Sequence, residues 1–252
     1  MTNYCPECGA RVIRNRLTPR VLAEQMNDEV LSLDNKFLRT FIDLFKRPEA
    51  VINGFIIGVR KRHLNVISYW AIALSVLGLQ LFILKSFFPE FLDAQNDMFG
   101  MTKVEGDNPV NTYNELVGKS MSEYQNVMFT VLMPFLAIGT WIIYLDKRRY
   151  NYTEHLVINL YINSQWIFVG IVINVGLALF GVSNIMMASI IAMPLSLAYG
   201  SYVFKRLYGN SFLNSLLRYI AAFIIYMFAF SIIMVIFVIG FFIYLFATGK
   251  MG

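Results

Sequence analysis

Hydrophobic residues in this chain are gathered into five long runs, separated by stretches in which polar and charged residues predominate. The runs cover residues 66–88, 127–145, 156–180, 185–204 and 219–246. A helix needs about 20 apolar residues to cross the roughly 30 Å hydrocarbon core of a bilayer, and a helix satisfies its own backbone hydrogen bonds there. The pattern therefore predicts an all-α integral membrane protein with five transmembrane helices.

The composition agrees with this architecture. Of the 252 residues, 57% are hydrophobic and only 15% are charged, and the mean hydropathy is +0.56. So few charges would leave the surface of a soluble protein of this length poorly covered. Because the charged residues 1–65 precede the first run, we expect no signal peptide.

The charge of the connecting segments alternates in sign. Residues 1–65 contain eleven Lys and Arg, whereas segment 89–126 contains seven Asp and Glu against two Lys. The later connections are basic again, at Lys147, Arg148, Arg149, Lys205, Arg206 and Arg218. Basic connections stay in the cytoplasm. We therefore expect an inner-membrane protein with a cytoplasmic N-terminus, an acidic outer loop at 89–126 and an outer tail at 247–252.

The net charge of +5 is accordingly expected to face anionic lipid headgroups, and not nucleic acid. The candidate headgroup contacts are Arg47, Arg60, Lys61, Arg62, Lys147, Arg148 and Arg149.

Residues 1–17 form a Cys-x-x-Cys knuckle followed by a basic linker. Cys5 and Cys8 are the two cysteines of the chain, and their spacing can present two thiolates to one zinc ion, whereas a tetrahedral site needs four ligands. The knuckle either holds no metal, or shares a zinc between two subunits of a homodimer, or is completed by a histidine. Zinc is the only cofactor that the sequence suggests.

Residues 18–65 are predicted to form amphipathic helices. Phe37, Phe41, Leu44 and Phe45 recur at helical spacing, and Pro48 restarts a helix at a position where a missing N–H costs nothing. An aromatic stripe flanked by basic residues is typical of a helix that lies in the membrane interface. The alternative is a helix packed on the cytoplasmic ends of the transmembrane helices.

The third run carries a polar stripe formed by Glu154, His155, Asn159, Asn163 and Asn174. Such a stripe must face protein or water and not lipid, so it forms either interhelical hydrogen bonds or the wall of a hydrated cavity or headgroup groove. Glu154 and His155 could also perform acid–base chemistry. No other residues complete a catalytic site, and no ionisable group lies at the centre of a run. An enzyme or an ion-coupled transporter is therefore not expected.

Small residues recur every four positions in the fourth run, at Ala188, Ala192, Ser196 and Gly200. This repeat predicts the close approach of another helix. The third run, with its own small residues, is the expected neighbour.

The order of motifs resembles a bacterial membrane-protein family of unknown function with a zinc-ribbon-like head. The elements that carry the resemblance are the Cys-x-x-Cys-Gly knuckle, Thr40-x-x-Asp43-Leu44-x-x-Arg47-Pro48, Gly58-x-Arg60-Lys61-Arg62 and Glu154-His155-Leu156. Heads in that family look like two-knuckle ribbons, and one knuckle is present here. The five-span plan is more loosely similar to Yip-type membrane proteins, which implies an adaptor role by analogy.

The sequence thus favours a non-enzymatic protein that organises or regulates partners, or organises the membrane, through its basic N-terminal segment and packed helices. The alternative is a facilitator-type transporter or lipid-handling protein that uses the polar stripe of the third run as a path.

Overall fold

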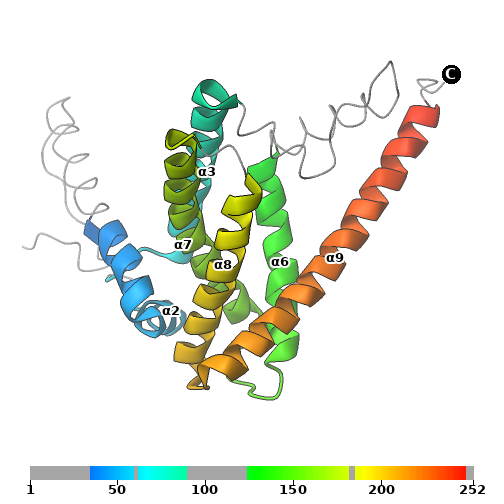
Figure 1. Cartoon of the computed structure of the whole chain (residues 1–252). Coiled ribbons are helices and arrows are strands. Elements are labelled where there is room, and N and C mark those ends of the chain that lie inside the picture. The colour runs from blue at the N-terminus through cyan, green and yellow to red at the C-terminus, as the bar shows by residue number, and fades with distance from the viewer. Residues whose placement is uncertain (1–34, 60–61, 90–123, 182–184, 248–252) are drawn as a thin grey trace, which may run out of the picture.

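The computed structural model describes residues 35–59, 62–89, 124–181 and 185–247, and every regular element within those ranges is helical (Figure 1). A helix over residues 35–46 comes first. It is followed by α2 (Pro48–Ile56), α3 (Val66–Phe87), α6 (Gln125–Ile143), α7 (Tyr152–Leu179), α8 (Ile185–Tyr208) and α9 (Phe212–Ala247). The Cys-x-x-Cys knuckle, most of the acidic segment and the C-terminal tail lie outside the described residues.

Within the described residues, four helices are long and apolar enough to cross a membrane: Val66–Phe87, Asn126–Ile143, Tyr152–Leu179 and Phe212–Ile233. They coincide with the first, second, third and fifth predicted runs. α8 is a helix of 24 residues at the place of the fourth run. The prediction of an all-α fold is therefore confirmed for the described residues, and four of the five predicted spans are long and apolar enough to cross a membrane.

Two of these helices begin earlier than hydropathy predicts, because side-chain caps decide where they start. α7 begins at Tyr152 and not at residue 156, since Asn151 caps it. α9 begins at Phe212 and not at residue 219, and the Ser211 hydroxyl accepts a hydrogen bond from the N–H of Asn214. Such an N-terminal cap lets a helix extend into polar sequence.

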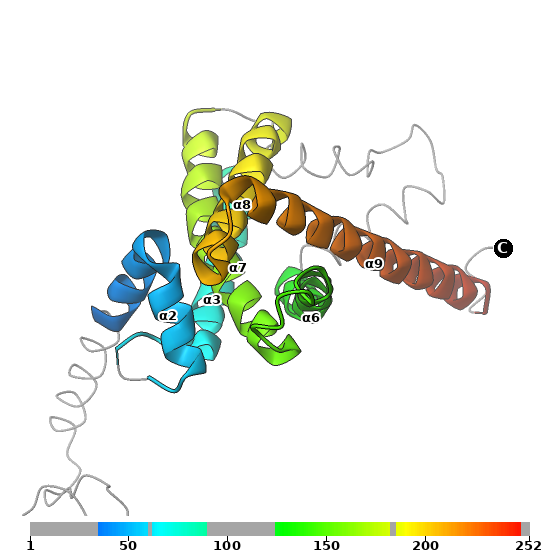
Figure 2. The same cartoon turned by 90° about the horizontal axis from the view of Figure 1, so that it is seen from below.

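The spans form a bundle in which α7 contacts α3, α6 and α8, while α9 packs on α6 and α8 (Figures 1 and 2). Two glycines allow the crossings with α9. A Cβ at Gly139 would lie 2.7 Å from the carbonyl oxygen of Ala222, and one at Gly200 would overlap the ring of Tyr219. The close approach expected at Gly200 therefore exists, but its partner is α9 and not the third span.

Beyond these crossings α9 diverges from the other helices (Figures 1 and 2). Its outward face carries exposed apolar side chains, at Ile224, Phe228, Ile232, Val235 and Ile239. This spacing of three and four residues gives one continuous apolar stripe along the helix.

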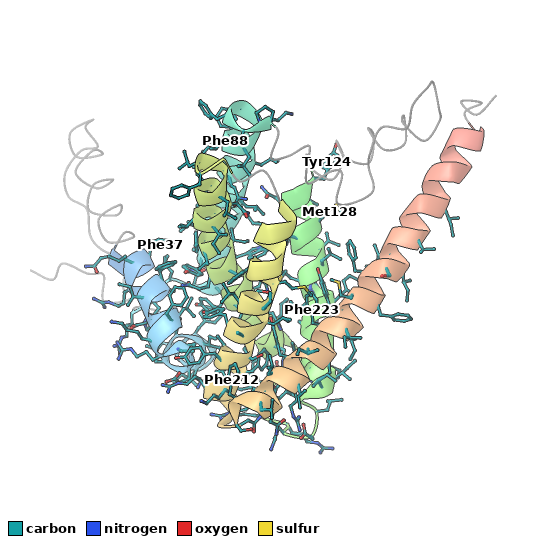
Figure 3. The ribbon with its side chains drawn as sticks, in the orientation of Figure 1. Phe37, Phe88, Tyr124, Met128, Phe212 and Phe223 are labelled. Atoms are coloured by element: carbon teal, nitrogen blue, oxygen red, sulfur yellow. The ribbon has the colours of Figure 1, made fainter. Side chains whose placement is uncertain are left out.

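The N-terminal element, which we define as helix 35–46, α2 and residues 62–65, packs against the bundle. The Phe37 ring (Figure 3) meets the Phe168 ring edge-on with 5.2 Å between their centroids. Leu44, Val51 and Ile52 are fully buried. The sequence left open whether these helices lie in the membrane interface or pack on the transmembrane helices, and the contacts described here are packing contacts with the bundle. Pro48 occupies the first turn of α2, as predicted.

Candidate functional site

The polar stripe begins at the capped end of α7. The Asn151 side chain accepts a hydrogen bond from the Glu154 N–H at 2.9 Å, and the Glu154 carboxylate accepts one from the Asn151 N–H at 2.7 Å. Both N–H groups belong to the set that a helix cannot satisfy internally at its start. Glu154 therefore serves the helix cap.

His155, one residue further on, is 1% exposed and links three helices. Its Nδ1 lies 3.1 Å from the Thr140 hydroxyl of α6, and its Nε2 lies 3.0 Å from the Tyr208 hydroxyl of α8. The Thr140 hydroxyl donates its hydrogen to the carbonyl of Ala137. With that donor used, Thr140 accepts from His155 Nδ1–H, which leaves Nε2 to accept from Tyr208. This pattern corresponds to a neutral imidazole protonated at Nδ1.

The next stripe residue, Asn159, is fully buried. Its amide donates to the Thr140 hydroxyl and to the His155 carbonyl, both at 2.8 Å. Asn163 donates to the Asn159 carbonyl of its own helix at 2.8 Å. Asn174 is half-buried, and its side chain has no hydrogen-bond partner among the described residues. The first part of the stripe therefore joins α6, α7 and α8 within a packed interior.

Aromatic rings enclose His155. Tyr144 stacks on Phe204 and Tyr208, with 4.9 Å and 4.4 Å between ring centroids. Phe204 also stacks on His155, and Tyr150 meets the Tyr208 ring edge-on at 5.3 Å. These contacts shield the imidazole and its hydrogen bonds from water.

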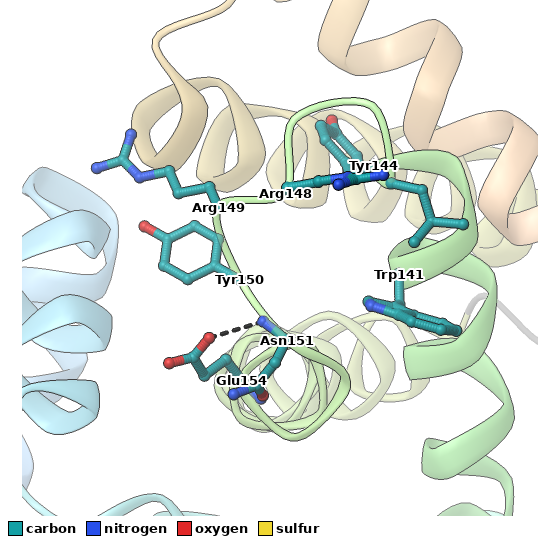
Figure 4. A pocket seen from close by; sticks show the side chains of 8 residues that line it. Trp141, Tyr144, Arg148, Arg149, Tyr150, Asn151 and Glu154 are labelled. Atoms are coloured by element: carbon teal, nitrogen blue, oxygen red, sulfur yellow. Dashed lines mark hydrogen bonds between the residues drawn. The ribbon is translucent and has the colours of Figure 1, made fainter.

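A pocket of about 510 Å³ lies beside this cluster, between the end of α6 and the start of α7 (Figure 4). It is lined by Trp141, Tyr144, Leu145, Arg148, Arg149, Tyr150, Asn151 and Glu154. Tyr144 and Tyr150 thus form part of the pocket wall and part of the shell around His155. The stripe residues other than Glu154 do not line the pocket.

The same end of the bundle carries an ion pair that ties α9 to α6. The Arg218 guanidinium donates to both carboxylate oxygens of Asp146, at 2.6 and 2.8 Å, and to the Ile143 carbonyl at 3.0 Å. The hydrogen bonds and charge of Arg218 lower the pKa of the Asp146 carboxyl. Asp146 therefore remains an anion paired with its own arginine.

The predicted headgroup residues fall into different environments. Lys147, Arg148, Arg149 and Arg62 are exposed, whereas Arg60 and Lys61 lie outside the described residues. Arg47 pairs with Asp43 while leaving 47% of its side chain exposed. Cys5 and Cys8 also lie outside the described residues, so zinc binding stays a prediction.

Asp43, which belongs to one of the motifs that carry the family resemblance, forms a buried contact that the sequence pattern does not predict. It is 5% exposed, and its carboxylate accepts from Arg47 Nε at 3.0 Å and lies 2.9 Å from His63 Nε2. Burial alone would raise the pKa of Asp43, but hydrogen bonds from Arg47 and His63 and their charges outweigh it. The pKa is consequently below its usual value of 3.8. The neighbouring Thr40 hydroxyl accepts from the Leu64 N–H at 2.9 Å.

These contacts lie within a segment that matches a known protein family. Residues 34–78 match the model of a family described as a protein of unknown function, DUF3667. No curated protein and no solved structure matches the chain. The chain is therefore similar to this family over the N-terminal element and the first part of α3, and the match brings no activity with it. The zinc-ribbon and Yip-type resemblances stay predictions.

Proposed function

We propose that this chain is a non-enzymatic inner-membrane protein that organises or regulates a partner at the cytoplasmic face through its N-terminal element. In this proposal α8 also crosses the membrane and brings the number of spans to five, because its 24 residues rise about 36 Å at 1.5 Å per residue. The basic connections at one end of the bundle favour a cytoplasmic location for that end and for the N-terminus.

The observation that carries the proposal is the way two helices of the bundle hold helix 35–46. Three side chains donate to its main-chain carbonyls: Gln165 to Phe41 at 3.1 Å, Tyr199 to Leu44 at 3.2 Å and Tyr202 to Lys46 at 3.2 Å. The last four carbonyls of a helix have no partner within it, so the hydrogen bonds to Leu44 and Lys46 complete the end of the helix, and all three hydrogen bonds fasten it to the bundle.

The outer side of the fastened helix is amphipathic. Leu38, Ile42 and Phe45 are 57%, 39% and 41% exposed, and Arg39 is exposed beside them. Apolar side chains interleaved with cations suit a surface at the boundary between headgroups and acyl chains. A partner can dock there on a surface whose position relative to the spans is fixed.

The packing of the polar stripe favours this function over transport. His155 and Asn159 are 1% and 0% exposed and use their polar groups to join helices. Hydrogen bonds of this kind stabilise a membrane bundle by about 0.6 kcal/mol each, which is a structural contribution.

Reconstitution tests the proposal. In proteoliposomes we expect the purified protein to move neither solute nor lipid faster than protein-free liposomes. The Asn159→Leu, Asn163→Leu variant should lose thermal stability, whereas Asn174→Leu, at the stripe position without a described partner, should change stability little. Flux in the wild type that the double variant abolishes, with its folding intact, would overturn the proposal.

A photo-crosslinking side chain at Ile42 in cells supplies the positive test. We expect a discrete protein adduct that disappears when Arg39→Glu reverses the local charge. Labelling of lipid alone would exclude the partner-binding role.

The second candidate is a lipid-handling protein, and the pocket between α6 and α7 is the observation that favours it. The pocket opens next to the first residue of the polar stripe, Glu154. If the stripe were a path from this pocket, the double asparagine variant would lose lipid movement while keeping its stability.

A further inference from the structure

The pocket between α6 and α7 has walls of mixed chemistry at the end of a candidate span. Asn126–Ile143 is the apolar segment of α6, so Trp141 lies in its last turn and the remaining pocket residues follow it. Trp and Tyr are enriched at this depth because their rings are apolar and their edges are polar. Trp141, Tyr144 and Tyr150 supply these rings (Figure 4).

Most charges around the pocket already have partners. Asp146 is held by Arg218, and the Glu154 carboxylate caps α7 through the Asn151 N–H. The Arg149 guanidinium lies over the Tyr150 ring, 5.4 Å from its centroid. Arg148 differs: it is exposed and makes no hydrogen bond or ion pair with any residue that the structure describes.

The backbone at Arg148 is also exceptional. Its φ is +45°, and among the described residues it is the one position other than glycine with a positive φ. Side chains with a Cβ rarely adopt this conformation, and glycine or asparagine would adopt it at less cost. Backbone strain of this kind is found preferentially where function requires a particular side chain. Here the strained position presents a cation at the rim of the pocket (Figure 4).

The charge on the walls selects the kind of ligand. Arg148 and Arg149 supply two positive charges and Glu154 one negative charge, so the pocket favours a group with a single negative charge. A guanidinium binds phosphate oxygens through paired hydrogen bonds. Leu145, which lines the pocket, and Ile142, which follows the pocket residue Trp141 in sequence, are both exposed apolar residues at this end of α6, where acyl chains would run.

We propose that this pocket binds the phosphodiester headgroup of one anionic membrane lipid. Arg148 contacts the phosphate, the aromatic rings surround the glycerol portion, and the acyl chains extend along the outer surface of α6. The site is separate from the N-terminal surface, and it exists whether or not a partner protein docks there. Failure of the partner proposal therefore leaves this one standing, and the reverse also holds.

The test uses the purified full-length protein, with bound lipid counted by native mass spectrometry after incubation with phosphatidylglycerol or phosphatidylcholine. We expect retention of one phosphatidylglycerol and little phosphatidylcholine. Arg148→Gly should keep the fold, because it relieves the positive φ, and should weaken phosphatidylglycerol binding about tenfold, the effect of losing one charge-assisted contact. Lys205→Gln, which removes an exposed charge of α8 that does not line the pocket, should bind as the wild type does.

Three results would overturn the proposal. Equal weakening by Arg148→Gly and Lys205→Gln would show general attraction to a basic surface and not a site. Unchanged lipid binding in Arg148→Gly, together with a higher melting temperature, would show that Arg148 has only a structural role. Displacement of the lipid by millimolar inorganic phosphate or glycerol phosphate would assign the pocket to a soluble anion.

Discussion

At the scale of single residues, Asp43 determines how the N-terminal element is held. Its carboxylate joins Arg47, the N-cap residue of α2, to His63, which follows α2 and precedes α3. The three side chains thereby close the element on itself across 20 positions of sequence. Removing one partner of a buried charged contact leaves the others unsatisfied, and that costs more than the contact contributes.

We therefore expect Asp43→Ala to destabilise the N-terminal element by about 2 kcal/mol. Hydrogen exchange should show lost protection in residues 48–65, while α6 and α9 stay protected. The matched control is Glu49→Gln, which removes the Glu49–Arg206 ion pair, whose side chains are 28% and 43% exposed. A pair this exposed contributes roughly 0–1 kcal/mol. Equal effects of the two substitutions would contradict the role given to Asp43.

The Asp43 carboxylate should also make the stability of the N-terminal element depend on pH in the acidic range. Because its pKa is lowered in the folded protein, Asp43 adds stability at pH values above 3.8, its usual pKa. This stability is lost as the pH falls through the lower folded pKa. Protection of residues 48–65 should therefore decrease below about pH 4 in the wild type. In Asp43→Asn that decrease should be smaller, since the amide does not titrate, whereas Glu49, whose pKa is lowered by its hydrogen bond from Arg206, still does. An unchanged acid profile would argue against this assignment.

At the scale of elements, glycine positions decide how closely the helices cross. Gly139 faces the main chain of α9, where a Cβ would lie 2.7 Å from the Ala222 carbonyl oxygen. A main-chain atom cannot move aside as the end of a side chain can, so α6 and α9 would have to separate. Gly176 of α7 has nothing within 4 Å of the corresponding position.

Gly139→Ala is accordingly expected to lower stability by about 1–3 kcal/mol, the usual cost of overfilling a packed contact. Gly176→Ala should be neutral or slightly stabilising, because alanine favours the helix by up to about 1 kcal/mol. Thermal unfolding in detergent, followed by fluorescence, compares the two variants. A larger loss in Gly176→Ala than in Gly139→Ala would show that the crossing described here is wrong.

Elements also show which features the sequence could predict. The apolar runs predict the positions of the helices, because a span needs about 20 consecutive, predominantly apolar residues and such a run is visible in the sequence. Hydropathy alone predicts starts for α7 and α9 that are too late, because side-chain caps at Asn151 and Ser211 let each helix begin in polar sequence. The stripe on α7 was visible, but its partners Thr140 and Tyr208 were not, since they belong to other helices.

At the scale of the whole molecule, the charge pattern predicts an orientation that depends on whether α8 crosses the membrane. With five spans, the acidic segment 89–126 and the tail 247–252 lie on the same, outer side. With four spans, in which α8 does not cross, the tail lies on the inner side with Lys147, Arg148 and Arg149. Single cysteines at Asn108, Thr153 and Gly252, in a Cys5→Ser, Cys8→Ser background, distinguish the two arrangements.

We expect an impermeant maleimide to label Asn108→Cys and Gly252→Cys in spheroplasts, because both positions face outward in the five-span arrangement. Thr153→Cys should react only after the membrane is opened. Labelling of Asn108→Cys and Thr153→Cys on the same side would refute the orientation, and protection of Gly252→Cys alone would refute the fifth span.

The knuckle of Cys5 and Cys8 gives a second prediction for the whole molecule. If two chains share one four-cysteine site, the purified protein should contain about half a zinc per chain. Elemental analysis measures this ratio, and Cys5→Ser should abolish it. Protein that is free of metal after gentle purification would exclude the shared site.

The sequence alone determined that the chain is helical, that its helices are long and apolar enough for a membrane, and which connecting segments are basic. These properties follow from composition and local periodicity. Tertiary structure decided which side chains meet: Asp43 with His63, Thr140 with His155, and Gly200 with Tyr219. It also placed Arg148 at the rim of a pocket. Such contacts join positions that are far apart in the chain. Helical periodicity and hydropathy are local properties, so they do not specify which residues of different helices meet.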